Sequence, residues 1–240
     1  MNSQTQIVVV HGALGSAAQM EPVAAALHSL GTVHNIELPG HGQTPLAAGA
    51  SFTIGAFVDS LRSAVVSLGL TAADTTSRPV VFGYSMGGYT ALALDASSPG
   101  TFAGIATLGT RFAWSPALAL RELSRLDPDI LLEKIPKFAS ALDARHQVAG
   151  GWKGVLEHTG QLLTALGDKP LLTRETMAAI QSRVTIAVGE SDDTVGIDEA
   201  REYAAFIPNA NARVISATPH PIERVAPSDI VSIVADVMQR

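Results

Sequence analysis

Residues 79–93, which read P-V-V-F-G-Y-S-M-G-G-Y-T-A-L-A, constrain the fold more than any other stretch of this chain. An apolar, β-branched run predicts a buried strand before the G-x-S-x-G at residues 83–87. Tyr89, Leu92 and Ala93 then recur at helical spacing. Strand, sharp turn and helix are the context in which Ser85 stands above a sheet and faces the N–H groups of the helix that follows. Such a serine is a nucleophile if a base reaches it; the alternative is a glycine-rich turn with a solvated serine.

The remaining sequence predicts an alternation of strands and helices. Further strands are expected at residues 6–10, 32–38, 102–108, 184–188 and 212–215, with helices near 16–30, 54–68, 198–206 and 228–238. This order predicts an α/β fold with a mostly parallel sheet of about six strands and helices on both faces. Ser16 and Gln19 form the pattern of a capping box at the first helix. Residues 111–181 predict helices and no strand.

Composition excludes several classes of protein. With 47% hydrophobic and 16% charged residues, the chain can bury a large core and is not disordered. The net charge of −6, without a basic run, predicts no nucleic-acid partner. The absence of cysteine suits a reducing cytoplasm, and no apolar window predicts a signal peptide or a membrane span. No cofactor is expected, and no His, Asp or Glu spacing predicts a metal site.

Candidate partners for Ser85 follow two later strands, as expected where reactive groups collect at the carboxyl ends of a parallel sheet. His220 follows the last strand, in a loop that Pro219 and Pro221 stiffen, and is our candidate base. Other histidines lie in less suitable places; His146 and His158, on polar helix faces, are expected to be solvated. The orienting acid should come from the turn after the preceding strand, which supplies three carboxylates, Glu190, Asp192 and Asp193.

An oxyanion hole would complete the chemistry. The residue after the nucleophile, Met86, supplies one backbone N–H. A second is expected from the loop after the first strand, where Ala13 follows His11 and Gly12. The alternative for that loop is a strand-end turn without chemistry.

With these motifs in order, the chain resembles the α/β-hydrolase superfamily, and more narrowly a branch of small, capped bacterial serine hydrolases and esterases. The resemblance covers most of the chain and includes P-G-H-G at residues 39–42 and G-E-S-D at residues 189–192. Its Gly-x-x-acid pattern selects Asp192. It implies a single domain over residues 1–240, with a small helical cap inserted at about 111–180 after the fourth strand. Serine, rather than aspartate, at position 85 argues against epoxide and haloalkane chemistry.

The expected function is hydrolysis of a carboxylic ester or thioester with a small to medium acyl group, on a small-molecule substrate, through an acyl-enzyme. A lyase or C–C bond hydrolase with the same triad, or a ligand-binding protein on a hydrolase scaffold, is the alternative. The residues expected to line the substrate pocket are Leu14, Arg111, Phe112, Trp114, Phe138 and Trp152. Met177 is a further apolar candidate, and each apolar residue of the insert can instead belong to the insert's own core. Arg111 can bind a substrate carboxylate or form a structural ion pair.

Overall fold

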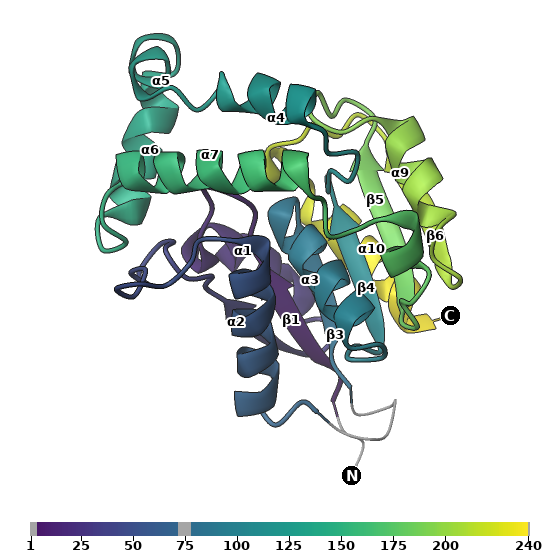
Figure 1. Cartoon of the computed structure of the whole chain (residues 1–240). Coiled ribbons are helices and arrows are strands. Elements are labelled where there is room, and N and C mark those ends of the chain that lie inside the picture. The colour runs from purple at the N-terminus through teal and green to yellow at the C-terminus, as the bar shows by residue number, and fades with distance from the viewer. Residues whose placement is uncertain (1–3, 72–77, 240) are drawn as a thin grey trace.

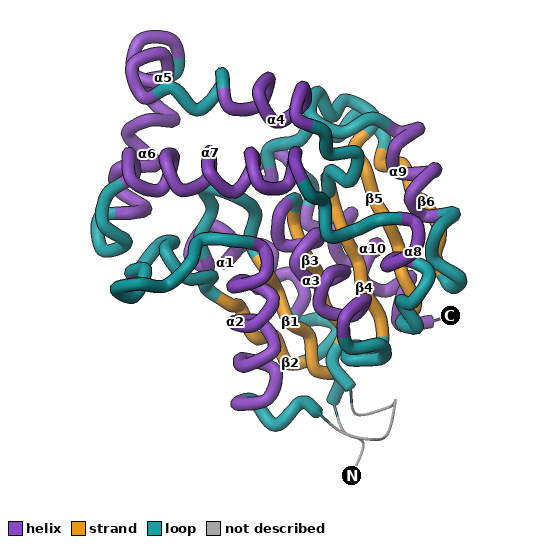
Figure 2. Tube along the Cα trace, viewed as in Figure 1, coloured by secondary structure: helices purple, strands orange, loops and turns teal. Residues whose placement is uncertain are grey.

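The computed structural model describes residues 4–71 and 78–239. The polar linker predicted before the Ser85 strand falls partly on residues 72–77, outside the described residues. Within the described part of the chain, six parallel strands form one sheet in the order β2-β1-β3-β4-β5-β6 (Figures 1 and 2). This confirms the predicted α/β class. The strands are β1 Gln6–Val10, β2 Thr32–Ile36, β3 Val80–Tyr84, β4 Gly104–Leu108, β5 Arg183–Gly189 and β6 Ala210–Ile215.

Helices cover both faces of the sheet. Helices α1 (Ala17–Leu27) and α10 (Pro227–Gln239) pack on one face. The opposite face carries α2 (Ile54–Ser67), α3 (Met86–Ser97) and α9 (Ile197–Ala204) (Figure 1). The central strands read as unbroken apolar runs because both of their faces are buried.

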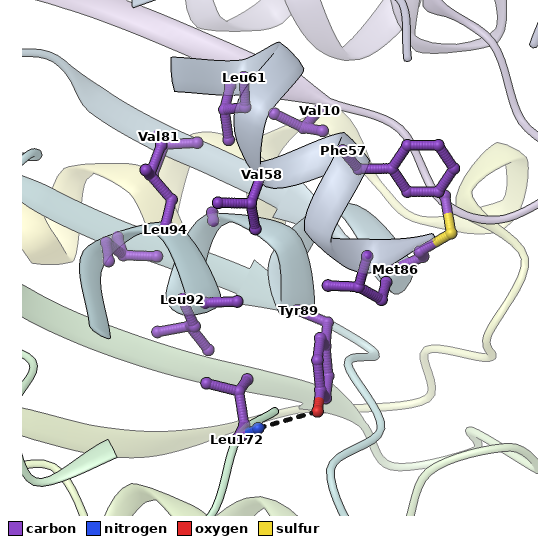
Figure 3. Packing of buried hydrophobic residues seen from close by; sticks show 14 of the residues in the cluster. Val10, Phe57, Val58, Leu61, Val81, Met86, Tyr89, Leu92, Leu94 and Leu172 are labelled. Carbon is purple, nitrogen blue, oxygen red and sulfur yellow. Dashed lines mark hydrogen bonds between the residues drawn. The ribbon is translucent and has the colours of Figure 1, made fainter. Parts of the chain in front are cut away.

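The largest apolar cluster in the described part of the chain lies between α2, α3 and the sheet (Figure 3). It contains Phe57 and Leu61 of α2 against Leu92 of α3, all fully buried. Tyr89 crosses this layer, and its hydroxyl accepts hydrogen bonds from the N–H groups of Leu171 and Leu172, both at 3.0 Å. The helix that follows Ser85 is therefore tied to a segment far along the chain.

Five helices lie between β4 and β5, and we call residues 116–177 the helical segment. Its bounds are α4 Pro116–Leu123, α5 Pro128–Lys134, α6 Pro136–His146, α7 Trp152–Asp168 and α8 Arg174–Met177. In Figure 1, α4 and α7 lie across one end of the sheet. A small apolar cluster of their own holds α5, α6 and α7 together, and Leu14 of the β1–α1 loop packs against it. No helix in the described residues is long and apolar enough to cross a membrane.

Element boundaries differ from the sequence predictions where side chains compete for backbone groups. β2 ends at Ile36 rather than Leu38, and the Leu38 N–H donates to Nε2 of His11 instead of to a strand. At α1, Ser16 accepts from the Gln19 N–H at 3.2 Å as predicted. The Gln19 amide, however, donates to Glu223 at 2.7 Å, so the capping box is only half formed. The Gln19 side chain thus pairs with the distant Glu223 instead of with the backbone of Ser16.

Candidate active site

Ser85 occupies a strained turn between β3 and α3. Its φ of 50° and ψ of −116° are unusual for a residue with a side chain, and such strain is kept where the surrounding structure over-determines it. One contact that holds the strained turn is the hydrogen bond from the Ser85 N–H to the Leu108 carbonyl, at 2.9 Å. The turn also folds Gly83 against Gly88, where a Cβ on Gly83 would lie 2.5 Å from the Gly88 nitrogen. Gly83, the first glycine of the motif, is therefore required for the close approach of two backbone segments.

Asp192 and His220 meet although 28 positions separate them. Asp192 Oδ2 lies 2.8 Å from His220 Nδ1, and the carboxylate side chain is only 2% exposed. Its other oxygen accepts from the N–H groups of Thr194 and Val195 at 2.8 and 2.9 Å. Burial raises the pKa of Asp192, but these hydrogen bonds outweigh burial and leave that pKa below its ordinary value. The carboxylate therefore stays ionised and holds an Nδ1–H on the imidazole.

The His220 ring is brought to the Ser85 side of the sheet by contacts with β3 and β4. The Tyr84 hydroxyl, one residue before Ser85, donates to the His220 carbonyl at 3.0 Å. Gly109, which follows β4, has a φ of +63°, and a Cβ there would lie 3.0 Å from the imidazole and 3.2 Å from Asp192 Oδ2. A side chain at position 109 would displace the pair, so glycine is needed for the ring to sit at the end of β4.

The β1–α1 loop, which contains Ala13, borders the same cavity as Ser85. The Gly12 carbonyl accepts from His11 Nδ1 at 2.8 Å and from the Gly15 N–H at 3.1 Å. Because the peptide unit is planar and trans, holding this carbonyl on one side directs the Ala13 N–H to the opposite side. Ala13, Met86 and Ser85 line the same cavity. The His-Gly pair noted in the sequence thus belongs to a structured loop in which buried His11 orients a peptide plane.

A largely apolar cavity of about 370 Å³ opens at Ser85, beneath the helical segment. Four of the predicted lining residues, Leu14, Arg111, Trp114 and Phe138, line it. Arg111 is only 8% exposed; it lies 3.5 Å from Glu122 and donates to the Thr194 carbonyl. It is already paired within the protein. Side chains of α4, α5 and α7 that also line the cavity are Glu122, Leu131, Thr159, Leu162, Leu163 and Leu166.

Three apolar candidates do not line this cavity. Phe112 is fully buried and stacks on Tyr203, with ring centroids 5.1 Å apart. Trp152 belongs to the apolar cluster of the helical segment, and Met177 belongs to the main core. Helical spacing marks such residues as apolar but does not say whether they face a core or a cavity, because both environments select the same side chains.

Sequence reasoning also missed two polar residues at the end of α6. His146 was expected to be solvated, yet it is fully buried, with ring nitrogens 3.0 Å from the Leu14 carbonyl and from the Gly42 N–H. Arg145 donates to the same Leu14 carbonyl at 2.6 Å. His158 also has a partner: it stacks on Phe52, with centroids 5.3 Å apart. These contacts join segments more than 100 positions apart, and no local pattern signals them.

His41, between the glycines of P-G-H-G, is also fully buried. Its ring packs edge-on against those of His11 and His146, with centroids 4.9 and 5.9 Å away. Nδ1 donates to the Pro39 carbonyl at 3.1 Å, and Nε2 has no hydrogen-bond partner among the described residues. Despite this gathering of imidazoles, the described side chains form no cluster able to hold a metal ion.

A doubly wound parallel sheet, a strained serine after its third strand and an Asp–His pair after its fifth and sixth define the α/β hydrolase class. A sequence model described as "Alpha/beta hydrolase family" matches residues 7–230, so the chain belongs to that family. No curated protein matches the chain.

Solved structures resemble it over nearly their full length, at identities that establish the fold alone. An esterase from Thermogutta terrifontis is 18% identical, with a TM-score of 0.75 over 99% of this chain and 90% of that one. An enol-lactonase from Burkholderia xenovorans is 19% identical, with a TM-score of 0.76 over 100% and 93%. A 2-hydroxy-6-oxo-6-phenylhexa-2,4-dienoate hydrolase from a Rhodococcus species is 18% identical, with a TM-score of 0.77 over 99% and 91%.

Proposed function

We propose that this chain is a serine hydrolase that cleaves a carboxylic ester or thioester with a small to medium acyl group. Ser85 attacks the acyl carbonyl, while His220 accepts its proton and passes it to the leaving alcohol or thiol. Asp192 keeps the imidazole in the tautomer with Nδ1–H, which leaves Nε2 as the base. Water activated by His220 then releases the acid from the acyl-enzyme.

The observation that carries this proposal is the 2.8 Å Asp192–His220 hydrogen bond, held against Gly109 and Tyr84 at the turn that bears Ser85. In the proposed mechanism, the N–H groups of Ala13 and Met86 stabilise the oxyanion, and each such donor typically contributes ~10²–10³ in rate. The helical segment acts as the cap.

The size and lining of the cavity fit a substrate with a small acyl or alcohol group. Its volume of about 370 Å³ lies at the lower end of the ~300–1,000 Å³ range of ligand pockets. Its walls near Ser85 are apolar, and the charged side chains Arg111 and Glu122 compensate each other. An apolar group of modest length therefore enters without leaving a buried charge unpaired.

C–C bond hydrolysis or lyase chemistry on an acidic substrate is the second candidate. Arg125 lines the cavity beside Arg111, and both share Glu122, at 3.2 and 3.5 Å. Arg121 also lies 3.5 Å from Glu122. Three cations on one carboxylate favour a substrate anion, although each guanidinium is already engaged. The third candidate function is ligand binding by a protein whose triad is slow or inactive.

Hydrolysis of p-nitrophenyl esters of increasing acyl length, by the wild type and by Ser85→Ala, tests the proposal. We expect turnover that requires Ser85, peaks at short to medium chains, and is accompanied by one phosphonate adduct at Ser85. Equal turnover by Ser85→Ala would refute the nucleophile. Labelling at Ser85 without ester turnover would refute ester hydrolysis and favour C–C bond hydrolysis or lyase chemistry. Very slow labelling would indicate a ligand-binding protein.

A further inference from the structure

The carbonyl of Leu14 lies in an unusual environment for a loop group. Leu14 has a φ of 59°, in the left-handed region that is sterically unfavourable for a residue with a side chain. Its carbonyl accepts from Arg145 Nη1 at 2.6 Å and lies 3.0 Å from His146 Nε2. Two consecutive residues of the helical segment thus hold one oxygen atom of the β1–α1 loop.

The side chain of Leu14 is held by the same segment. It packs against the apolar cluster of α5, α6 and α7, which contains Leu142 and Trp152. Both the carbonyl and the side chain of Leu14 are therefore held by helices that the chain reaches more than 100 positions later. A left-handed conformation that would otherwise relax is fixed by these contacts.

Ala13 lies between two fixed carbonyls. On one side the Gly12 carbonyl is held by His11 and by the Gly15 N–H. On the other side the Leu14 carbonyl is held by Arg145 and His146. The Leu14 carbonyl lies in the same peptide unit as the Gly15 N–H, which donates to the Gly12 carbonyl at 3.1 Å. Holding the Leu14 carbonyl therefore also fixes the group that restrains the Gly12–Ala13 peptide unit, and with it the direction of the Ala13 N–H. If only the first restraint remained, rotation about the bonds of Ala13 and Leu14 would let the loop tip.

The two residues of α6 also reach other loops around the site. His146 Nδ1 accepts a hydrogen bond from the Gly42 N–H at 3.0 Å. The ring proton is therefore on Nε2, which donates to the Leu14 carbonyl. Arg145, whose side chain is 15% exposed, lies 3.7 Å from Glu223, just after the His220 loop. Glu223 in turn accepts from Gln19 at 2.7 Å.

We propose that Arg145 and His146 are positioning residues, which hold the Leu14 carbonyl and thereby aim the Ala13 N–H at the reacting carbonyl. The inference rests on the proposed function, because it treats Ala13 as an oxyanion donor. It makes the docking of the helical segment and the assembly of the oxyanion hole a single event. The cap then contributes to the rate of the reaction as well as to the shape of the pocket.

The test uses full-length Arg145→Met, His146→Leu and the double variant. Lys137→Met is the matched control, because Lys137 is an exposed cation on the same helix. We expect each single variant to lower kcat on p-nitrophenyl esters about tenfold, less than the ~10²–10³ for complete loss of a donor. KM should change less than threefold, and the control should match the wild type. His146→Gln, which keeps a donor and an acceptor, should recover much of kcat and guards against misfolding of His146→Leu.

A second measurement separates this inference from the proposed function. In ¹⁵N-labelled protein, the Ala13 amide resonance should shift or broaden in the Arg145 and His146 variants and stay in place in Lys137→Met. An unmoved Ala13 resonance, or an unchanged kcat in a destabilised double variant, would overturn the positioning role. A moved resonance in a protein without Ser85-dependent turnover would keep the positioning role and refute the esterase.

Discussion

The hydroxyl of Tyr84 donates a hydrogen bond to the main-chain carbonyl of His220, at 3.0 Å. This bond joins the residue before the candidate nucleophile to the candidate base, across 136 positions of sequence. Burial raises the pKa of the Tyr84 phenol above its ordinary value, so the hydroxyl remains a donor at any pH at which the enzyme would work. The β3 strand thereby carries Ser85 and also anchors the loop of His220.

Tyr84→Phe should therefore impair catalysis more than folding. Losing one neutral hydrogen bond of about 1 kcal/mol would lower kcat roughly fivefold if it were lost wholly from the transition state. KM should stay within twofold. Steady-state ester hydrolysis is the measurement, and Tyr203→Phe, on α9 away from this loop, is the control. A kcat equal to that of the wild type would show that the prolines alone hold His220 in place.

Asp192→Asn should abolish most activity, whereas Asp193→Asn should not. Asparagine at position 192 stabilises the wrong imidazole tautomer, and comparable losses of the acid cost ~10⁴ in kcat. Asp192 also accepts hydrogen bonds from the Thr194 and Val195 N–H groups. Asp193 carries the same side chain and charge, so Asp193→Asn is the matched control. Measuring kcat for both variants decides the assignment, and a larger loss at position 193 would move the acid by one residue.

Stability should fall as the pH drops from 7 to 5 because of buried histidines. Burial lowers the pKa of His41 well below its ordinary value, and burial also lowers that of His146. Both groups are neutral in the folded state and take up protons near pH ~6.5 once unfolded. Their contribution to stability is therefore complete above about pH 6.5 and is lost below it. The titratable and charged groups that face them are His11, Glu37 and Arg145.

Urea unfolding across this pH range measures the effect. His41→Asn replaces the Nδ1 donor to Pro39 without a titrating group, so its unfolding free energy should fall less with pH than that of the wild type. His28→Gln, at an exposed helix end, serves as the control. Parallel slopes for wild type and His41→Asn would show that other groups set the acid sensitivity.

Tyr89→Phe should destabilise the protein without changing its shape. The Tyr89 hydroxyl accepts from the N–H groups of Leu171 and Leu172 (Figure 3 shows the second bond), and phenylalanine would leave both donors without that acceptor. Leaving a buried donor unsatisfied costs about 1–3 kcal/mol. Urea unfolding at pH 7 should show a loss of about 2 kcal/mol. A loss below 0.5 kcal/mol, the size of an ordinary surface substitution, would mean that the two N–H groups find other acceptors.

Part of the site could be predicted from the sequence because its residues follow strand ends. Ser85, Asp192 and His220 each come after an apolar run, and parallel strands bring their carboxyl ends to one edge of the sheet. The proline loop of His220 and the glycines around Ser85 have local physical reasons that the sequence displays. The prediction of six parallel strands depended on the same short-range patterns. The catalytic roles themselves remain predictions for the experiments above.

The lining of the pocket could not be predicted in the same way. Phe112 and Phe138 look alike in sequence, yet one is fully buried against Tyr203 and the other reaches the cavity. Likewise, His146 lies on a helix whose spacing predicted a solvated face, yet contacts with Leu14, Gly42 and His41 bury it. Side-chain environment depends on which elements pack against each other, and periodicity carries no information about that partner.

The sequence by itself determined the order of strands and helices, the sharp turn at Ser85 and the positions of the candidate acid and base after two strands, because short-range sterics and apolar periodicity govern these features. Only the tertiary structure decided that Asp192 meets His220 beside Gly109, that Arg111 is paired with Glu122, and that Arg145 and His146 hold Leu14. These contacts join residues far apart in the chain. They form because packing of the whole core brings the segments together, and no local preference specifies them.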